Sequence, residues 1–189
     1  AQARALERGL SVGIYRDLAV GADRSGADAW SDQEVIVQEA KVGCPPDPFN
    51  MLGQDWGIPP LHPLAMRAQR YAPFIAMLRA NMRHAGGLRI DHVMGLMHLF
   101  WIPMDGTPAD GAYVKYPFDE LLAIVALESQ RHRCLVVGED LGTVPEGFRE
   151  KMAAAKVLSY RVLYFEKEGD RFRQPDEYPD LALGCVTTH

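Results

Sequence analysis

The sequence of 189 residues contains few cysteines and no long apolar run. Cys44, Cys134 and Cys185 are odd in number, far apart and without a CxxC pair, which fits reduced thiols in packing roles better than disulfides or a zinc site. No segment approaches the ~20 apolar residues that span a membrane, and the N-terminus lacks the apolar run of a signal peptide. We therefore expect a cytoplasmic protein with no membrane partner.

Basic stripes and nucleotide-binding motifs are also missing. The net charge of -5 and the absence of a dense Lys or Arg run argue against nucleic acid as a partner. No GxGxxG or GxxxxGK[ST] follows a predicted strand, which weakens a nucleotide-binding interpretation. What the sequence does have is 48% hydrophobic residues, enough to bury a substantial core in one or at most two domains.

Strand-like and helix-like stretches alternate along the chain. We predict strands at 11–20, 87–93, 134–140, 157–165 and 181–189. Apolar residues at helical spacing predict helices at 64–84, with a kink at Pro73, and at 119–133. Another helix should start near Thr143, because Thr143 and Glu146 have capping-box spacing and Pro145 suits a first turn. The segments 41–63 and 99–117 are predicted loops, the first rich in proline and glycine.

This order of elements indicates an α/β fold with a parallel sheet. The predicted strands are apolar on both faces and should be covered by helices. An open doubly wound sheet and a (β/α) barrel both fit. Polar residues cluster at the C-terminal ends of successive strands, which converge on one mouth in a barrel, and this favours the barrel. They are Arg16 with Asp17, Arg89 with Asp91 and His92, Glu139 with Asp140, and His189.

Two of these residues, Asp91 and Glu139, could work as a catalytic pair. They are separated by about one βα unit with a long loop, so they should lie at the ends of neighbouring strands. A retaining glycosidase needs a carboxylate nucleophile and a general acid ~5 to 5.5 Å apart. Arg89 should point to the same side as Asp91 and keep it ionised. An apolar surround and a nearby carboxylate would raise the pKa of Glu139 toward that of a general acid.

Other interpretations fit the same spacing. Arg89 and Asp91 could form a buried ion pair, and Glu139 could cap a helix. Asp91, His92 and Glu139 could bind a metal, but no HxH or HxxxH pair supports one, so we expect none. In the 41–63 loop, Trp56 could stack on a sugar or merely pack on the barrel.

Several strings resemble a known family. They are YRDLAVGADRSGADAW, GCPPDPFNMLGQDWGIPP, LRIDHVMGLMHLFWIP, GAYVKYPFDELLAI, VVGEDLGTVP, YRVLYFE and VTTH. Together they resemble the 4-alpha-glucanotransferases called amylomaltase or disproportionating enzyme, glycoside hydrolase family 77, over essentially the whole chain. The GQ-x-WG loop separates this family from its relatives in the alpha-amylase clan.

The resemblance implies a retaining transglycosylase on a (β/α)8 barrel that moves alpha-1,4-glucan segments from a malto-oligosaccharide donor to a sugar acceptor. It implies that Asp91 is the nucleophile and Glu139 the general acid/base, without cofactor or metal. The substrate-binding positions it implies are Arg89, His92 and His189 near the bound sugar, Asp17, the loop residues Asp47, Gln54 and Trp56, and Phe165 near the acceptor.

The resemblance also implies that the chain is the central part of one catalytic barrel, roughly strands 3 to 7, with both ends truncated. In the family an aspartate follows the Thr-His pair directly, whereas this sequence ends at His189. We therefore expect residues 1–189 to be inactive alone. Open sheet edges could lead such a piece to self-associate.

Two other functions stay open at this stage. One is hydrolysis by a member of the alpha-amylase clan, which would share the barrel and the carboxylates. The other is a carbohydrate-binding remnant that keeps the scaffold without the chemistry.

Overall fold

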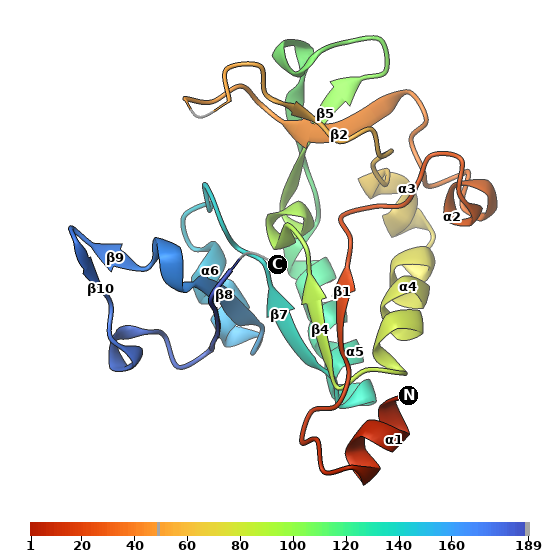
Figure 1. Cartoon of the computed structure of the whole chain (residues 1–189). Coiled ribbons are helices and arrows are strands. Elements are labelled where there is room, and N and C mark those ends of the chain that lie inside the picture. The colour runs from red at the N-terminus through yellow and green to blue at the C-terminus, as the bar shows by residue number, and fades with distance from the viewer. Residues whose placement is uncertain (49, 188–189) are drawn as a thin grey trace. The chain divides into compact units, whose positions relative to one another are not determined.

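The computed structural model describes residues 1–48 and 50–187 (Figure 1). The chain forms two compact units. The first comprises Ala1–Leu18, Leu78–Met94 and Leu122–His189, and the second comprises Ala19–Met77 and Gly95–Leu121. His189, a predicted site residue, lies outside the described residues.

The first unit is built on a five-stranded parallel sheet with the order β1-β4-β7-β8-β11. The strands are β1 (Tyr15–Leu18), β4 (Gly87–Ile90), β7 (Leu135–Gly138), β8 (Leu158–Val162) and β11 (Ala182–Cys185). Their spatial order follows the chain order, whereas a doubly wound sheet reverses at a switch point. The sheet therefore has the unidirectional order of a (β/α) barrel, as predicted.

A glycine lets the segments that lead into β1 and β4 approach closely. A Cβ on Gly86, which directly precedes β4, would lie 1.6 Å from the carbonyl oxygen of Val12. Residues of β4 are buried throughout. In β1, by contrast, Tyr15, Arg16 and Asp17 are exposed, so the prediction that every strand is buried on both faces is wrong for this strand at the sheet edge.

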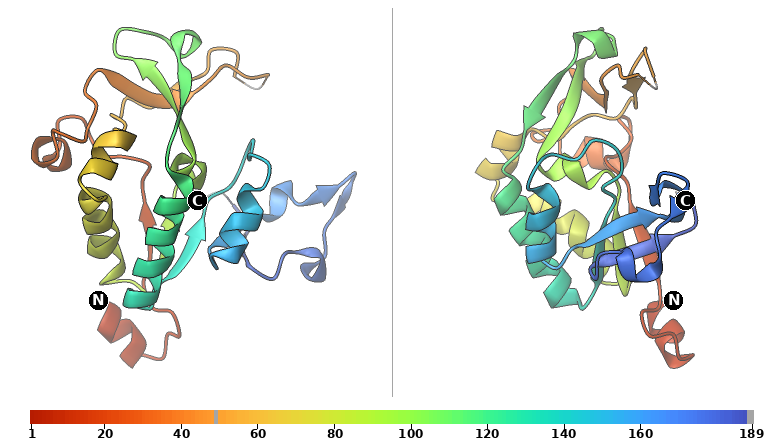
Figure 2. Two further views of the ribbon diagram at one scale, coloured as in Figure 1. Left: turned by 180° about the vertical axis from the view of Figure 1, so that it is seen from behind. Right: turned by 90° about the vertical axis from the view of Figure 1, so that its left-hand side faces the viewer.

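Helices and short hairpins complete the first unit. Helix α6 (Phe148–Ala154) and the part of α5 (Phe118–His132) in this unit lie on the same face of the sheet (Figure 2). Acidic residues in the first turn of α5 and basic residues in its last turn suit the helix dipole. The remaining elements are α1 (Gln2–Glu7), β9 (Lys167–Glu168), β10 (Arg171–Phe172) and 3-10 helices at Leu163–Phe165 and Pro175–Glu177. A further 3-10 helix, Val93–Leu96, begins in this unit and ends in the second.

Helix α6 begins later than the sequence predicts. Its N-cap is Gly147, which has a left-handed backbone with φ 74°. Thr143 and Glu146 lie before that residue, so the predicted capping box does not start this helix. The left-handed turn interrupts any helical path from Thr143, and glycine accepts that conformation without steric cost.

The second unit contains a four-stranded antiparallel sheet with the order β3-β2-β5-β6. Its strands are β2 (Ala40–Cys44), β3 (Gln54–Asp55), β5 (His98–Pro103) and β6 (Ala112–Lys115). The segment predicted as a loop at 99–117 is thus largely a hairpin. The predicted loop at 41–63 is irregular only in part, because it contains most of β2 and all of β3, whose backbones pair within this sheet. Its strands are stabilised by cross-strand aromatic pairs such as Phe100 with Tyr113, whose ring centroids are 5.2 Å apart.

The predicted helix at 64–84 is two helices, α3 (Pro63–Ala68) and α4 (Ala72–Met82). Arg70 and Tyr71 between them have positive φ angles of 52° and 60°. The predicted kink at Pro73 is therefore a full break that begins earlier. Proline fits the first turn of a helix but lacks the N–H needed to continue one, so the chain restarts its helix there. A further short helix, α2, spans Ala27–Ser31.

The described residues contain no helix long and apolar enough to cross a membrane. Cys44, Cys134 and Cys185 are free thiols, as predicted.

Candidate active site

The carboxyl ends of β4 and β7 bring the predicted carboxylate pair to one edge of the parallel sheet. The two strands are direct neighbours, with Ile90 opposite Gly138 in the register. Asp91 and Glu139 each follow the last residue of their strand. The prediction that they lie at the ends of neighbouring strands is therefore confirmed.

Arg89 joins two carboxylates at this edge. Its Nη1 donates to both Oδ atoms of Asp17, at 2.7 and 2.9 Å, and its Nη2 forms an ion pair with Oδ1 of Asp91 at 2.7 Å. The side chain of Arg89 is only 6% exposed. Burial lowers the pKa of Arg89, but Asp17 and Asp91 outweigh it and hold that pKa above its ordinary value. The predicted pairing of Arg89 with Asp91 is thus present, and Asp17 joins it.

Glu139 lies in a different environment. The residue is 9% exposed, and its carboxylate accepts two backbone N–H groups, from His92 at 2.9 Å and from Leu141 at 2.8 Å. Burial raises the pKa of Glu139, the two backbone donors lower it, and the charge of Asp91 raises it again. The net shift is upward, as the apolar surround predicted, so the protonated form is favoured relative to an exposed glutamate.

His92 shapes the connection between these groups. It has a left-handed backbone with φ 45°, which is uncommon for a residue other than glycine. This turn directs its N–H toward the Glu139 carboxylate. The sequence singled out His92 for its side chain, and the structure adds a role for its backbone.

The predicted substrate-loop residues belong to the second unit. Trp56 donates its indole N–H to Oε1 of Gln54 at 2.9 Å, so these two residues act as a pair. Asp47 accepts the N–H of Asn50 at 2.7 Å and thereby holds a turn of the loop. Phe165, in the first unit, is 58% exposed and makes an edge-to-face contact with Tyr164.

Sequence reasoning missed one residue at the sheet edge. The ring of Tyr160, in β8, faces the Arg89 guanidinium at 5.2 Å from the ring centroid. Tyr160 lies within the YRVLYFE string, but neither spacing nor periodicity relates it to a residue 71 positions away. Among the described residues, no three His, Cys, Asp or Glu side chains gather as they would around a metal ion.

These features define an α/β protein of the (β/α)-barrel type that carries two carboxylates in contrasting surroundings at the carboxyl edge of its sheet. The sequence profile of the family described as 4-alpha-glucanotransferase, glycoside hydrolase family 77, matches residues 1–189. The chain belongs to this family.

Individual relatives agree with that assignment. A 4-alpha-glucanotransferase of Haemophilus influenzae is 51% identical over 183 residues, covering 97% of this chain and 26% of the relative. The Mycobacterium tuberculosis protein of the same name is 45% identical over 194 residues, covering 100% of this chain and 27% of the relative. The chain thus spans about a quarter of the length of these relatives.

Two solved structures share the fold. The amylomaltase of Corynebacterium glutamicum superimposes with a TM-score of 0.94 at 41% identity, over 99% of this chain and 27% of that one. An amylomaltase of Streptococcus agalactiae, solved in complex with acarbose, has a TM-score of 0.83 at 22% identity, over 97% of this chain and 38% of that one. The second likeness concerns the fold alone.

Proposed function

We propose that the chain is part of a 4-alpha-glucanotransferase that moves alpha-1,4-glucan segments between malto-oligosaccharides with retention of configuration. Membership of the family supports this activity. The observation that carries it is the ion pair between buried Arg89 and Asp91, beside a buried Glu139 whose pKa is raised. Because the chain spans about a quarter of its relatives' length, the activity belongs to a longer protein and residues 1–189 alone are inactive.

In the first step of the proposed reaction, Asp91 acts as nucleophile. Its carboxylate oxygen forms a bond to the anomeric carbon of the donor. The bond from that carbon to the glycosidic oxygen breaks, and its electron pair stays on the leaving oxygen. Glu139 gives its proton to that oxygen, so the leaving chain departs as a neutral alcohol. Arg89 holds the Asp91 carboxylate in a fixed orientation for the attack.

In the second step, Glu139 is ionised and takes the proton from a hydroxyl of the acceptor sugar. The acceptor oxygen bonds to the anomeric carbon, and the ester bond to Asp91 breaks with its electron pair returning to the carboxylate. Two inversions give net retention. The resting enzyme is restored, with a protonated Glu139 and an ionised Asp91.

We infer substrate contacts for residues of each unit separately. In the first, Asp17, His92 and Phe165 are proposed to contact the sugar, with Arg89 beside them. In the second, the paired Gln54 and Trp56 and the turn residue Asp47 offer an aromatic face and hydrogen-bonding groups suited to a glucan. His189 is proposed as a further contact on the resemblance of the VTTH string, and a cytoplasmic location on the pattern of cysteine usage.

The test uses an active protein that contains this chain, with maltotriose as the substrate. A ladder of longer glucans together with glucose is the expected result, whereas short products alone would establish hydrolysis instead. Asp91→Asn is expected to abolish transfer while the circular dichroism spectrum is unchanged. Asp180→Asn is the matched control. Asp180 is exposed and precedes the amino end of β11, which is the last strand of the sheet on the side away from β1.

A covalent trap examines the same assignment directly. A fluorinated glucosyl fluoride that reacts quickly but turns over slowly should leave a sugar on the peptide that contains Asp91, as seen by mass spectrometry. Labelling of another carboxylate, or transfer at near wild-type rate by Asp91→Asn, would remove Asp91 from the nucleophile role. Binding of maltotriose without any product would favour a carbohydrate-binding remnant.

A further inference from the structure

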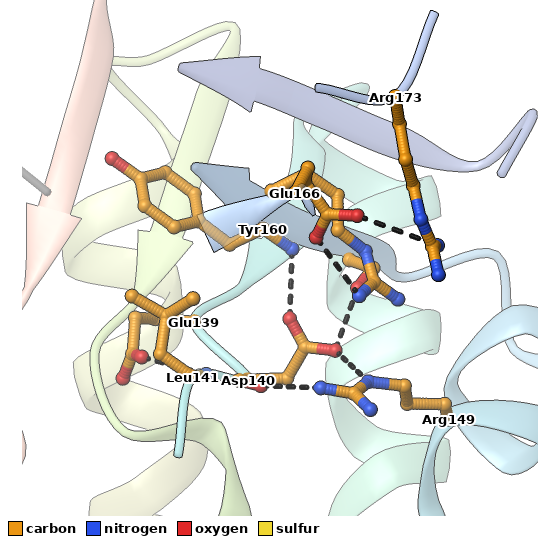
Figure 3. Close-up of polar contacts among 9 residues, drawn as sticks. Glu139, Asp140, Leu141, Arg149, Tyr160, Glu166 and Arg173 are labelled. Carbon is orange, nitrogen blue, oxygen red and sulfur yellow. Dashed lines mark hydrogen bonds and ion pairs between the residues drawn. The ribbon is translucent and has the colours of Figure 1, made fainter. Parts of the chain in front are cut away.

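Asp140, the residue after Glu139, is a buried acidic residue with no part in the mechanism above. It is 0% exposed. Its Oδ1 accepts the backbone N–H of Tyr160 at 2.9 Å, and its Oδ2 accepts the Ser159 hydroxyl and the Nε–H of Arg149, both at 2.6 Å (Figure 3). Arg149 also donates to the Asp140 carbonyl at 2.8 Å. Such complete pairing of a buried carboxylate indicates a rigid attachment.

Glu139 and Asp140 connect the end of β7 to its two neighbours in the sheet, β4 on one side and β8 on the other. Glu139 is tied to the end of β4 and to the segment after it: its N–H donates to the Ile90 carbonyl at 2.9 Å, its carbonyl accepts from Val93 at 3.0 Å, and its carboxylate accepts from His92. Asp140 is tied to β8 and α6 through the contacts above. The backbone that carries Glu139 is therefore held from both sides.

The attachment to β8 depends on this side chain. Regular pairing between β7 and β8 covers only Val137 with Leu158 and Gly138 with Ser159. Beyond that point the Asp140 carboxylate, rather than the strand ladder, receives the Tyr160 N–H. Without it, the residues that follow Gly138 would keep the contacts to β4 but lose their attachment to β8.

The contact between Asp140 and Tyr160 also connects Asp140 to the residues around the nucleophile Asp91. Tyr160 has its N–H bound to Asp140 and its ring against Arg89, which in turn holds Asp91. A shift of Tyr160 would change the support beneath that guanidinium as well.

We propose that Asp140 is a positioning residue, which holds the end of β7 against β8 and α6 and so sets the direction from which Glu139 delivers its proton. This inference rests on the proposed function, in which Glu139 is the general acid. Proton transfer needs the donor within hydrogen-bond reach of the leaving oxygen. A displacement of about 1 Å at such a site costs about 100-fold in rate.

The test is Asp140→Asn in an active protein that contains this chain. Asparagine has nearly the same shape and can still accept the Tyr160 N–H, but its amide nitrogen accepts neither Ser159 nor Arg149. We expect kcat/KM for maltotriose to fall about 10- to 100-fold. For α-maltosyl fluoride, whose fluoride leaves without a proton, the fall should be under about threefold.

The matched control is Glu128→Gln. Glu128 is likewise a buried carboxylate, 1% exposed, and is held by Arg79 and Arg131 on the helical layer. We expect it to lose stability with kcat/KM unchanged for both donors. An Asp140→Asn enzyme that loses activity equally with both donors would overturn the positioning role, because general damage to the fold does not depend on the leaving group.

Glu139→Gln separates this inference from the proposed function. A large loss of kcat/KM with maltotriose and a small loss with α-maltosyl fluoride identifies Glu139 as the general acid. The role of Asp140 is then decided by the same comparison of the two donors in Asp140→Asn. If Glu139→Gln does not distinguish the donors, the proposed function fails. Should Asp140→Asn not fold, Ser159→Ala decides, since it removes one hydrogen bond to Asp140. If Ser159→Ala loses more kcat/KM with maltotriose than with α-maltosyl fluoride, even by a smaller factor, the proposal is supported. Equal losses with the two donors overturn it.

Discussion

Replacing Arg89 by lysine separates the charge of this side chain from its geometry. The guanidinium holds two carboxylates at once, Asp17 through Nη1 and Asp91 through Nη2, and faces the Tyr160 ring. A lysine ammonium is a single point of charge on a flexible stem, so it cannot reproduce the planar fork. We expect Arg89→Lys to keep one carboxylate contact and lose the other.

The expected loss of stability in Arg89→Lys follows from the exposure of the two carboxylates that Arg89 binds. The side chains of Asp17 and Asp91 are 54% and 36% exposed, so water replaces part of what the guanidinium provides. One lost contact then costs about 0.5–1 kcal/mol, and the lost cation–π contact about the same, for a total of about 1–2 kcal/mol in the free energy of unfolding. The catalytic cost should be larger, about 10- to 100-fold in kcat/KM, because Asp91 loses its fixed orientation.

The assay combines urea unfolding with the transfer rate on maltotriose, and Arg79→Lys is the control. Arg79 also donates two bonds to one carboxylate, Glu128, at 2.9 Å each, but on α4 and α5 instead of the sheet edge. Arg79→Lys should lose about 1 kcal/mol of stability with an unchanged rate. If Arg89→Lys behaved in the same way, with stability lowered and kcat/KM intact, Arg89 would be structural only.

Two further predictions concern the pH dependence of stability and the contact between the segments that lead into β1 and β4. Burial raises the pKa of Glu139 in the folded protein, so its contribution to stability is present at low pH and lost as pH rises through that folded pKa. Glu139→Gln should therefore raise the urea midpoint at about pH 8 and leave it nearly unchanged at about pH 4, and an equal effect at both would contradict the burial argument. Gly86→Ala should cost about 2–3 kcal/mol, because its Cβ would lie 1.6 Å from the backbone oxygen of Val12. Gly184→Ala, with nothing within 4 Å of its Cβ, should change thermal unfolding little, and equal losses in the two variants would refute the steric explanation.

Local pattern was enough to predict the elements that are strongly apolar. The strands β4 and β7 lie within the predicted runs, and α5 matches the predicted helix almost residue for residue. The same patterns failed where a left-handed backbone interrupts a periodic stretch. Tyr71 with its positive φ and Gly147 with its left-handed backbone each move a helix boundary that spacing alone placed elsewhere. Pattern alone does not predict the hairpin of β5 and β6, because the proline- and glycine-containing turn between its strands is typical of one long loop.

The contacts of the candidate site also divide into those that the sequence predicts and those that it does not. The positions of Asp91 and Glu139 at strand ends, and the pairing of Arg89 with Asp91, follow from residues close together in the chain or from the rule that neighbouring parallel strands end at one edge. The contacts of Asp17 with Arg89 and of Asp140 with Ser159 join residues 72 and 19 positions apart. Neither contact can be predicted from the periodicity of the sequence.

The sequence by itself therefore determined the α/β class, the carboxylate pair at the sheet edge and the family that the chain resembles, because periodicity and short motifs are local properties. Only the tertiary structure decided that Arg89 bridges two carboxylates and that Asp140 attaches the end of β7 to β8 and α6. Those contacts depend on the register between strands that are distant in the chain, and register is set by the packing of the whole sheet.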